Sequence, residues 1–398
     1  MRIILHKKNN WKLFLTLVFI ICFTVLIFIS FKINKTRTDL VKEEEIIIAL
    51  KECIRVKVDK NCYENISDKI LEQYSYEDTL SIVKKYQDTQ ELRDCHEFAH
   101  YVGKKVFRRT NDLKSILISP NVNLCLQGFL HGAIIENFTQ MGVLTMDKND
   151  PLIKESFVNI CGTKDSFNFV GHFVECFHAL GHASMIMTGN NLPSSLEICD
   201  VLQKEQYQES CYSGALMENF NDTQSAPVAK EYFDKGDYNY PCYELDVKYS
   251  KLCYRWKGEY FFGLNKNNFE SSLVMCQKIK SEFVNECILR LARSYARNNY
   301  YQRDQVLGKC ILLPNKFQGD YCLRGVIELI ISDVNDPKIL EDYCDNSKER
   351  IDYCYDVVFG SIDLWASDTQ IEAKKSCGFI LNKIYQDKCL VVVGKKFI

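Results

Sequence analysis

The chain is poor in the residues that interrupt regular structure, with only 7 Pro and 18 Gly among 398 residues. This composition excludes collagen-like and low-complexity proteins. The chain also lacks a strong charge of either sign, since its formal net charge is −2. A protein that binds nucleic acid through phosphate contacts usually carries a basic surface, so we expect no nucleic-acid partner.

Several common signatures of chemistry are missing as well. The sequence contains no Gly-rich phosphate loop, no G-x-S-x-G and no dinucleotide fingerprint. It also has no C-x-x-C, the spacing typical of thiol redox pairs and of many zinc modules. Any site must therefore be sought in other patterns.

Cysteine, in contrast, is abundant, with 19 residues. A thiol content of this size is hard to keep inert in a reducing cytosol, so we expect an oxidising compartment. Cys22 lies in an apolar run, which leaves an even number of 18 cysteines for nine disulfides. They are Cys53, Cys62, Cys95, Cys125, Cys161, Cys176, Cys199, Cys211, Cys242, Cys253, Cys276, Cys287, Cys310, Cys322, Cys344, Cys354, Cys377 and Cys389.

The apolar run extends from Leu13 to Phe31, and its 19 residues carry no charge. At 1.5 Å per residue, a helix of this length nearly spans a hydrocarbon core of about 30 Å. We predict a single transmembrane helix. A signal peptide is the alternative, but the run is longer than a usual signal core and no small-x-small cleavage site follows. Lys and Arg flank both ends, so the cysteines set the orientation, with residues 1–12 cytoplasmic and residues 32–398 extracytoplasmic.

The spacing of the later cysteines predicts a repeat. From Cys242 the first members of successive pairs recur after 34, 34, 34 and 33 residues, and nine to eleven residues lie inside each pair. An aromatic or large apolar residue precedes each second cysteine, and a helix-like apolar stretch follows it. The pairs are Cys199/Cys211, Cys242/Cys253, Cys276/Cys287, Cys310/Cys322, Cys344/Cys354 and Cys377/Cys389, and the preceding residues are Tyr207, Tyr249, Phe283, Phe317, Ile351 and Tyr385.

This period is that of a two-helix unit, and over residues 199–398 the chain resembles tetratricopeptide-type arrays and their disulfide-stapled relatives. The Trp-Leu-Gly-Tyr signature of tetratricopeptides is absent, so the resemblance concerns spacing alone. It implies an all-α, solenoid-like array with a disulfide at each elbow and a surface that could bind a protein or peptide partner. Cys53 and Cys62 resemble a further elbow, whereas the pairing of Cys95, Cys125, Cys161 and Cys176 stays open.

The histidines are concentrated in front of this array. All six that lie outside the N-terminal tail fall within residues 96–182. Four of them form two HxxxH pairs, and residues four apart on a helix share one face, so each pair can present two imidazoles to one ion. The pairs are His96/His100 and His178/His182.

The surroundings of the two pairs are also repeated. Residues 132–138 (GAIIENF) align without a gap with residues 214–220 (GALMENF). Residues 94–138 and 175–220 are therefore interpreted as two copies of one motif whose HxxxH faces meet at a common centre. Glu136 and Glu218 match in this alignment and are candidate acid/base groups. His131 is a candidate third ligand, and because Ser213 takes its place in the second copy, the site need not be symmetric. His172 is interpreted as a structural residue.

His96 to His100 reads HExxH, and Gly103 extends it to HExxHxxG. These eight residues resemble the zincin metallopeptidases, in which the two histidines bind zinc and the glutamate activates water, so Glu97 is a candidate catalytic residue. The resemblance ends at Val106, where metzincins have a third histidine. In the second copy Ala179 stands where the glutamate would be, which makes the peptidase an alternative to a pure HxxxH site.

Taken together, the patterns predict an extracytoplasmic divalent transition-metal site. Zinc is the first candidate and iron or copper suits the same donors, as do nickel and manganese. The ligands would be His96, His100, His131, His178 and His182, with metal affinity falling below about pH 6.5, where an ordinary histidine is protonated. The leading function is metal binding or metal-dependent catalysis, and the alternatives are the peptidase and a non-enzymatic interaction scaffold.

The predicted organisation has five parts: a tail (1–12), a transmembrane helix (13–31), a linker with a first helical hairpin (32–85), a His/Cys-rich helical domain (86–220) and disulfide-stapled repeats (221–398). In its CHxxxH and GxxxEN segments the chain resembles bacterial membrane-anchored proteins rich in Cys and His.

Overall fold

Helices make up the regular structure of the chain as far as it is described. The structure is a computed structural model that describes Phe19 and residues 43–53, 60–86, 95–117, 119, 124–142, 151–163, 170–220, 231–233, 236–334, 336–361, 370–378 and 380–396. Within these ranges there is no strand, so the predicted all-α class is confirmed. The contacts group the chain into two compact units, which end and begin at Cys95 and His96.

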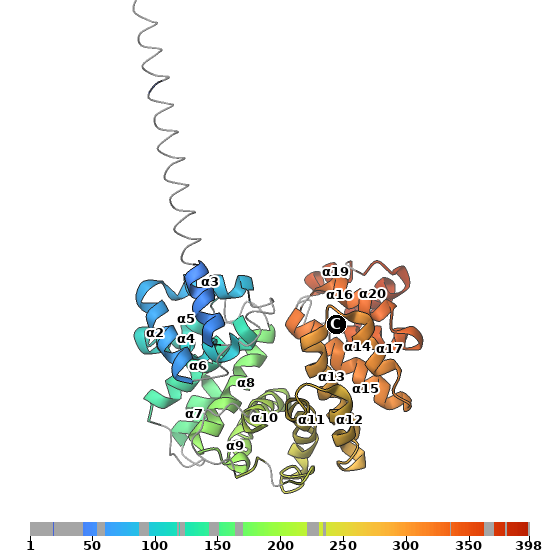
Figure 1. The fold of residues 1–398 in the computed structure, drawn as a ribbon, viewed down its shortest axis with the longest axis horizontal. Helices are drawn as coiled ribbons and strands as arrows, with labels where there is room; N and C mark the ends of the chain where they lie inside the picture. The colour runs from blue at the N-terminus through green and yellow to red at the C-terminus, as the bar shows by residue number, and fades with distance from the viewer. Residues whose placement is uncertain are drawn as a thin grey trace, which may run out of the picture. The chain divides into compact units, whose positions relative to one another are not determined.

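Short and long helices alternate along most of the second unit (Figure 1). The long helices are α4 (Cys95–Thr110), α6 (Leu124–Gln140), α8 (Val170–Met187), α10 (Glu205–Phe220), α11 (Val247–Leu264), α13 (Val284–Asn299), α15 (Lys316–Leu329), α17 (Ile351–Gly360) and α20 (Lys383–Lys396). The short helices are α5 (Leu113–Leu117), α7 (Pro151–Asn159), α9 (Leu192–Cys199), α12 (Phe269–Cys276), α14 (Arg303–Ile311), α16 (Pro337–Asp345) and α19 (Gln370–Cys377). The first unit contains α2 (Lys60–Gln73) and α3 (Tyr76–Tyr86).

Asn and Asp side chains start many of these helices. Asn191 and Asn268 each accept a hydrogen bond from the backbone N–H of a serine three residues later, at the beginnings of α9 and α12. Asp246, Asn315 and Asp336 cap α11, α15 and α16 in the same way. Each cap satisfies an N–H that has no partner inside the helix, which fixes where the helix begins.

Disulfides join most of the short segments to the long helices that follow them. The bridges are Cys53–Cys62, Cys161–Cys176, Cys199–Cys211, Cys242–Cys253, Cys276–Cys287, Cys310–Cys322, Cys344–Cys354 and Cys377–Cys389. Cys95 and Cys125 are each disulfide-bonded too. The predicted elbow pairs are confirmed, and Cys161–Cys176 adds the same kind of elbow between α7 and α8.

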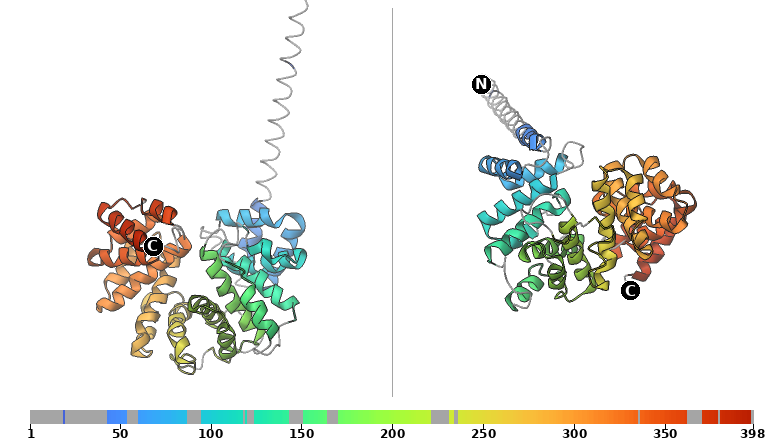
Figure 2. Two further views of the ribbon diagram at one scale, coloured as in Figure 1. Left: turned by 180° about the vertical axis from the view of Figure 1, so that it is seen from behind. Right: turned by 60° about the horizontal axis from the view of Figure 1, so that its bottom comes forward.

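Successive long helices pack on one another in chain order, from α6 through α8, α10, α11, α13, α15 and α17 to α20. Both views in Figure 2 show the colour advancing from each helix to its neighbour. This nearest-neighbour packing is that of a helical-repeat array. The repeats therefore include the His-rich segment, which the cysteine spacing alone had separated from them.

Glycine sets the distance between the long helices. A Cβ atom on Gly181 or Gly258 would lie 2.0 and 2.1 Å from the carbonyl oxygen of the second cysteine in the next long helix, Cys211 or Cys287. The same contact, at 2.0 Å, joins Gly103 in α4 to the carbonyl oxygen of Phe129 in α6. No side chain fits at such a contact, so these positions require glycine.

Aromatic pairs connect consecutive units. The residue after the second cysteine of one unit contacts the residue four positions before the second cysteine of the next. The pairs are Phe177/Tyr207, Tyr212/Tyr249, Tyr254/Phe283 and Tyr355/Tyr385, with ring centroids 3.8–4.9 Å apart. This explains most of the aromatic positions noted in the sequence. Phe317 differs, because it is 70% exposed.

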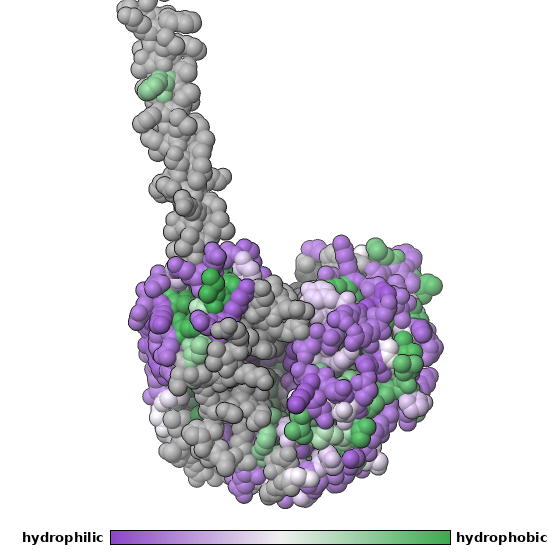
Figure 3. All heavy atoms as spheres, in the orientation of Figure 1, coloured by the Kyte–Doolittle hydropathy of each residue, from purple (hydrophilic) through white to green (hydrophobic). Residues whose placement is uncertain are grey.

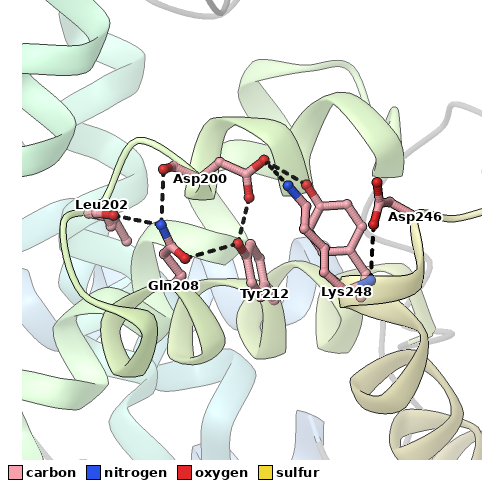
Figure 4. A network of polar contacts seen from close by, with 7 residues as sticks. Asp200, Leu202, Gln208, Tyr212, Asp246 and Lys248 are labelled. Atoms are coloured by element: carbon pink, nitrogen blue, oxygen red, sulfur yellow. Dashed lines mark hydrogen bonds and ion pairs between the residues drawn. The ribbon is translucent and has the colours of Figure 1, made fainter.

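A carboxylate reinforces two of these junctions. Asp200, directly after Cys199, accepts hydrogen bonds from the hydroxyls of Tyr212 (2.5 Å) and Tyr249 (2.8 Å), and its carboxylate pairs with Lys248 at 2.7 Å (Figure 4). Asp345, directly after Cys344, accepts a hydrogen bond from Tyr355 at 2.8 Å. A Cys-Asp followed by a Cys-Tyr is thus a sequence signal for this junction.

The membrane prediction lies outside the described residues, apart from Phe19. Among the residues that are described, no helix is both long enough and apolar enough to cross a bilayer. The face of the molecule in Figure 3 is mostly hydrophilic over the later repeats, with separate apolar residues between the polar ones. Exposed apolar side chains of these repeats include Leu312 and Leu381.

Candidate metal centre

Five histidines from three consecutive long helices meet at one place. His96 and His100 come from α4, His131 from α6, and His178 and His182 from α8. The ring centroid of His131 lies 4.6–5.5 Å from those of the other four. The structure thus brings together all five residues that the sequence nominates as ligands.

The helix contacts explain why these rings meet. A Cβ on Gly132 would lie 1.9 Å from the carbonyl oxygen of His100, and a Cβ on Gly214 would lie 1.9 Å from that of His178. His100 and His178 therefore occupy equivalent positions in their helices. Because His100 is the second histidine of its pair and His178 the first, the two HxxxH pairs are offset by one helical turn. The proposed alignment of residues 132–138 with 214–220 fits these contacts.

The equivalent position is also occupied in the helix between them. In each long helix this position lies two residues after that of the second cysteine. The second cysteine is Cys176 in α8, and Phe129 takes its place in α6. His131 therefore corresponds to His178, and Ser213 is the next residue of this row, in α10. His100, His131 and His178 thus form a row of three candidate ligands across neighbouring repeats. His96 lies one helical turn before this row and His182 one turn after it.

Within each pair the imidazole nitrogens are already close. Nε2 of His96 and Nε2 of His100 are 3.0 Å apart, and Nε2 of His178 and Nε2 of His182 are 3.3 Å apart. Two nitrogens bound at about 2.0–2.1 Å to one ion are roughly 2.9–3.4 Å apart for angles between 90° and the tetrahedral value. Both pairs thus have the separation that a shared ion requires.

The outer nitrogen of one histidine in each pair is held by an acceptor. Nδ1 of His96 is 2.8 Å from the backbone oxygen of Cys125, and Nδ1 of His182 is 2.9 Å from Oε2 of Glu218. An acceptor at Nδ1 keeps the proton there and leaves the Nε2 lone pair facing the centre. Ligating histidines in metalloproteins are typically fixed in this way.

His131 is different, because neither of its ring nitrogens has a hydrogen-bond partner although its side chain is only 1% exposed. Leaving a buried polar group unsatisfied costs about 1–3 kcal/mol. The ligand atoms gather into two groups, His96/His100/His131 and His131/His178/His182, and within each group they lie within 4.8 Å of one another. His131 belongs to both groups.

Burial keeps four of the five imidazoles neutral. It lowers the pKa of His96 to about 4, and it holds the pKa values of His100, His131 and His178 well below the usual value near 6.5. A neutral imidazole is the form that binds a metal ion. The buried histidine triads can therefore hold a metal ion at neutral pH.

The three candidate acids lie in different surroundings. Glu218 contacts the cluster through His182. Glu136, at the equivalent position of α6, instead accepts hydrogen bonds from Arg108 at 2.7 Å and from Gln140 at 3.2 Å. Glu97 belongs to neither ligand group. His172 lies within α8, but its side chain is outside the described part of the structure.

A basic cluster on α13 was not expected from the sequence. Arg290 pairs with Glu259 at 2.5 Å and stacks over the ring of Trp256 at 3.6 Å, and Arg297 reaches the same carboxylate at 3.4 Å. The positive charges of Arg290 and Arg297 also contribute to the lowered pKa values of His178 and His96. The only signal in the sequence was the helical spacing of three arginines at 290, 293 and 297.

The comparisons with known proteins identify no relative: no family model matches the chain, and neither a curated protein nor a solved structure shows significant similarity to it.

Proposed function

We propose that this protein binds a divalent transition metal through the five clustered histidines. The observation that carries the proposal is the buried His131, whose two ring nitrogens have no hydrogen-bond partner. A metal ion would satisfy a nitrogen that the protein leaves unsatisfied. The short Nε2–Nε2 separations and the acceptors at Nδ1 of His96 and His182 support the same conclusion.

Zinc is the ion we propose first, because an all-imidazole donor set suits it and the 3.3 Å separation of the His178 and His182 nitrogens agrees with its tetrahedral geometry. Iron and copper also accept imidazole ligands, and the Irving–Williams order makes copper the stronger competitor. Elemental content after purification from native membranes would decide among them.

The test is metal content of the full-length chain purified in detergent. We expect stoichiometric metal, removable by a chelator and restored with Zn²⁺. His131→Ala should lower Zn²⁺ affinity at least tenfold, because it removes the ligand common to both groups. Ser213→Ala, at the equivalent position of α10, is the matched control and should leave affinity unchanged. Wild-type protein that binds no Zn²⁺, Fe²⁺ or Cu²⁺ would overturn the proposal.

We also propose that residues 13–31 anchor the chain with the helical array on the extracytoplasmic side. The disulfides of the array support this placement, because such bonds persist in oxidising compartments. A chain shortened by residues 1–40 should move from the membrane fraction to the soluble fraction. Protease added to intact cells should digest the array of the full-length chain, and protection of the array would contradict the orientation.

A metal-dependent reaction is the second candidate, favoured by the count of ligands. Each group supplies three protein ligands, the number typical of catalytic zinc sites, which keep one position open for water or substrate. Glu97 and Glu218 would be the acid/base candidates, and Glu97 is the base in the peptidase alternative. Cleavage of a peptide library by wild-type protein, with loss in Glu97→Gln but unchanged metal content, would support the peptidase. Equal cleavage by both would exclude Glu97 as its base.

A further inference from the structure

The cluster contains two sets of ligands that share one residue. The first set comes from α4 and α6, the second from α6 and α8, and His131 is common to both. We infer that the centre holds two metal ions, with the imidazole ring of His131 bridging them through its two nitrogens. This inference rests on the proposed metal function and adds to it the number of ions and the role of His131.

Distances group the donor atoms into two sets. Donors at about 2.0–2.1 Å from one ion lie at most roughly 4.2 Å from one another. The donor atoms of this cluster assemble in groups of three, each from one HxxxH pair and His131. The rings of His100 and His182, which belong to different sets, have centroids 6.2 Å apart, while His131 lies 5.3 Å from the first and 4.6 Å from the second. His131 is thus the residue between the two pairs.

The surroundings of the two His131 nitrogens favour a bridging role. A histidine that binds one ion typically donates its other N–H to a carboxylate, carbonyl or water. His96 and His182 follow this pattern, since the backbone oxygen of Cys125 and the carboxylate of Glu218 lie next to Nδ1. His131 does not, because Nδ1 and Nε2 are both buried and without a hydrogen-bond partner. A second ion bound to the other nitrogen of His131 would take the place of the hydrogen-bond acceptor that lies next to Nδ1 of His96 and His182.

A bridging imidazole must lose a proton. Neutral imidazole has one nitrogen lone pair and one N–H. The first ion binds the lone pair, and the second binds the nitrogen left when that N–H proton departs to solvent. The bridge is therefore an imidazolate, and one proton is released for each chain that takes up its second ion. No oxidation or reduction takes place.

Zn²⁺ titration of the chelator-treated full-length chain tests the number of ions. Equilibrium dialysis followed by elemental analysis should give two Zn²⁺ per chain. His96→Ala and His182→Ala each damage one set only and should reduce the content to one, while far-UV circular dichroism stays unchanged. One Zn²⁺ per wild-type chain would overturn the bridge but keep the proposed function. No Zn²⁺ at all would overturn both.

Cu²⁺ loading tests the bridge itself. Two Cu²⁺ ions joined by an imidazolate are magnetically coupled, so the electron paramagnetic resonance signal of the first equivalent should be largely lost when the second is added. In His131→Ala, any two ions bound should keep additive, uncoupled signals. Two Cu²⁺ ions with additive signals in the wild-type protein would show separate sites and overturn the inference.

Discussion

Glu218 accepts a hydrogen bond from Nδ1 of His182, with 2.9 Å between Nδ1 and Oε2, whereas Glu136 at the equivalent position of α6 pairs with Arg108. Two glutamates that the sequence aligns thus have different partners. The preceding long helix accounts for the difference, because α8 presents His182 to Glu218 whereas α4 presents Arg108 to Glu136.

This difference predicts opposite results for two matched substitutions. Glu218→Gln removes the charge that orients His182, and loss of such an outer partner typically weakens metal binding 10–100-fold. Glu136→Gln should leave Zn²⁺ affinity unchanged and lower stability through its lost pair with Arg108. Competition with a chromophoric chelator measures both affinities. Equal affinities in the two variants would show that Glu218 has no role at the centre.

Lowering the pH should destabilise the metal-free protein. The pKa of His96 is about 4 in the folded chain, and that of an unfolded histidine is about 6.5. Between these values the unfolded chain binds more protons, so stability falls as the pH decreases from about 6.5 to 4. Chemical denaturation of the apo protein at pH 7.5, 6, 5 and 4 would measure the decrease.

The same shift changes the pH dependence expected of metal binding. An ordinary histidine predicts loss of affinity below about pH 6.5, but burial keeps His96 neutral to a lower pH in the folded protein. The affinity for the first Zn²⁺ ion should therefore hold between pH 6.5 and 5 and fall steeply near pH 4, whereas the affinity for a second ion, whose binding releases a proton, should fall with every unit of decreasing pH. A decrease centred on pH 6.5 would indicate exposed histidines as the ligands.

Glycine at the contact between α4 and α6 should be essential for the centre. A Cβ on Gly132 would lie 1.9 Å from the carbonyl oxygen of His100, so Gly132→Ala must push the two helices apart. We expect a loss of about 1–3 kcal/mol in stability, together with weaker Zn²⁺ binding. Gly308→Ala is the control, because a Cβ there meets nothing within 4 Å, and it should stabilise α14 by up to about 1 kcal/mol. Similar melting curves for both variants would contradict this account.

The junction at Asp200 should matter for stability alone. Asp200→Ala removes the acceptor of two tyrosine hydroxyls and of Lys248, and we expect a cost of about 2 kcal/mol. Asp345→Ala, which removes the acceptor of Tyr355 only, should cost about 1 kcal/mol or less. Urea denaturation measures both. Metal content should be normal in each variant, and a loss of metal from Asp200→Ala would show that the junction also shapes the centre.

Metal removal should lower the melting temperature even with every disulfide intact. A ligand present at 100 times its Kd stabilises the folded state by about 2.7 kcal/mol. We expect this difference between Zn²⁺-loaded and chelator-treated protein, and a much smaller one in His131→Ala. An unchanged melting temperature in the wild type would mean that the ion does not bind the folded centre.

Much of the fold could be predicted from the sequence because the disulfide-bonded cysteines recur at a regular spacing. The recurrence of 34 residues from Cys242 identified the two-helix unit, and the Cys199–Cys211 type of bridge followed from it. The first repeats were harder to recognise. In α4 and α6 the cysteine position is taken by Phe98 and Phe129, while Cys95 and Cys125 lie about one turn earlier, so the cysteine spacing does not continue into them.

For the candidate metal centre, the sequence by itself identified the two histidine pairs, because HxxxH places two imidazoles on one helix face whatever the helix packs against. Only the tertiary structure decided that His131 lies between both pairs and that Glu218 rather than Glu136 reaches the cluster. These relationships depend on the one-turn shift between α4 and α8, which the contacts of Gly132 and Gly214 fix. Contacts between helices depend on how closely their backbones approach each other. The spacing of residues within a single helix does not encode that distance.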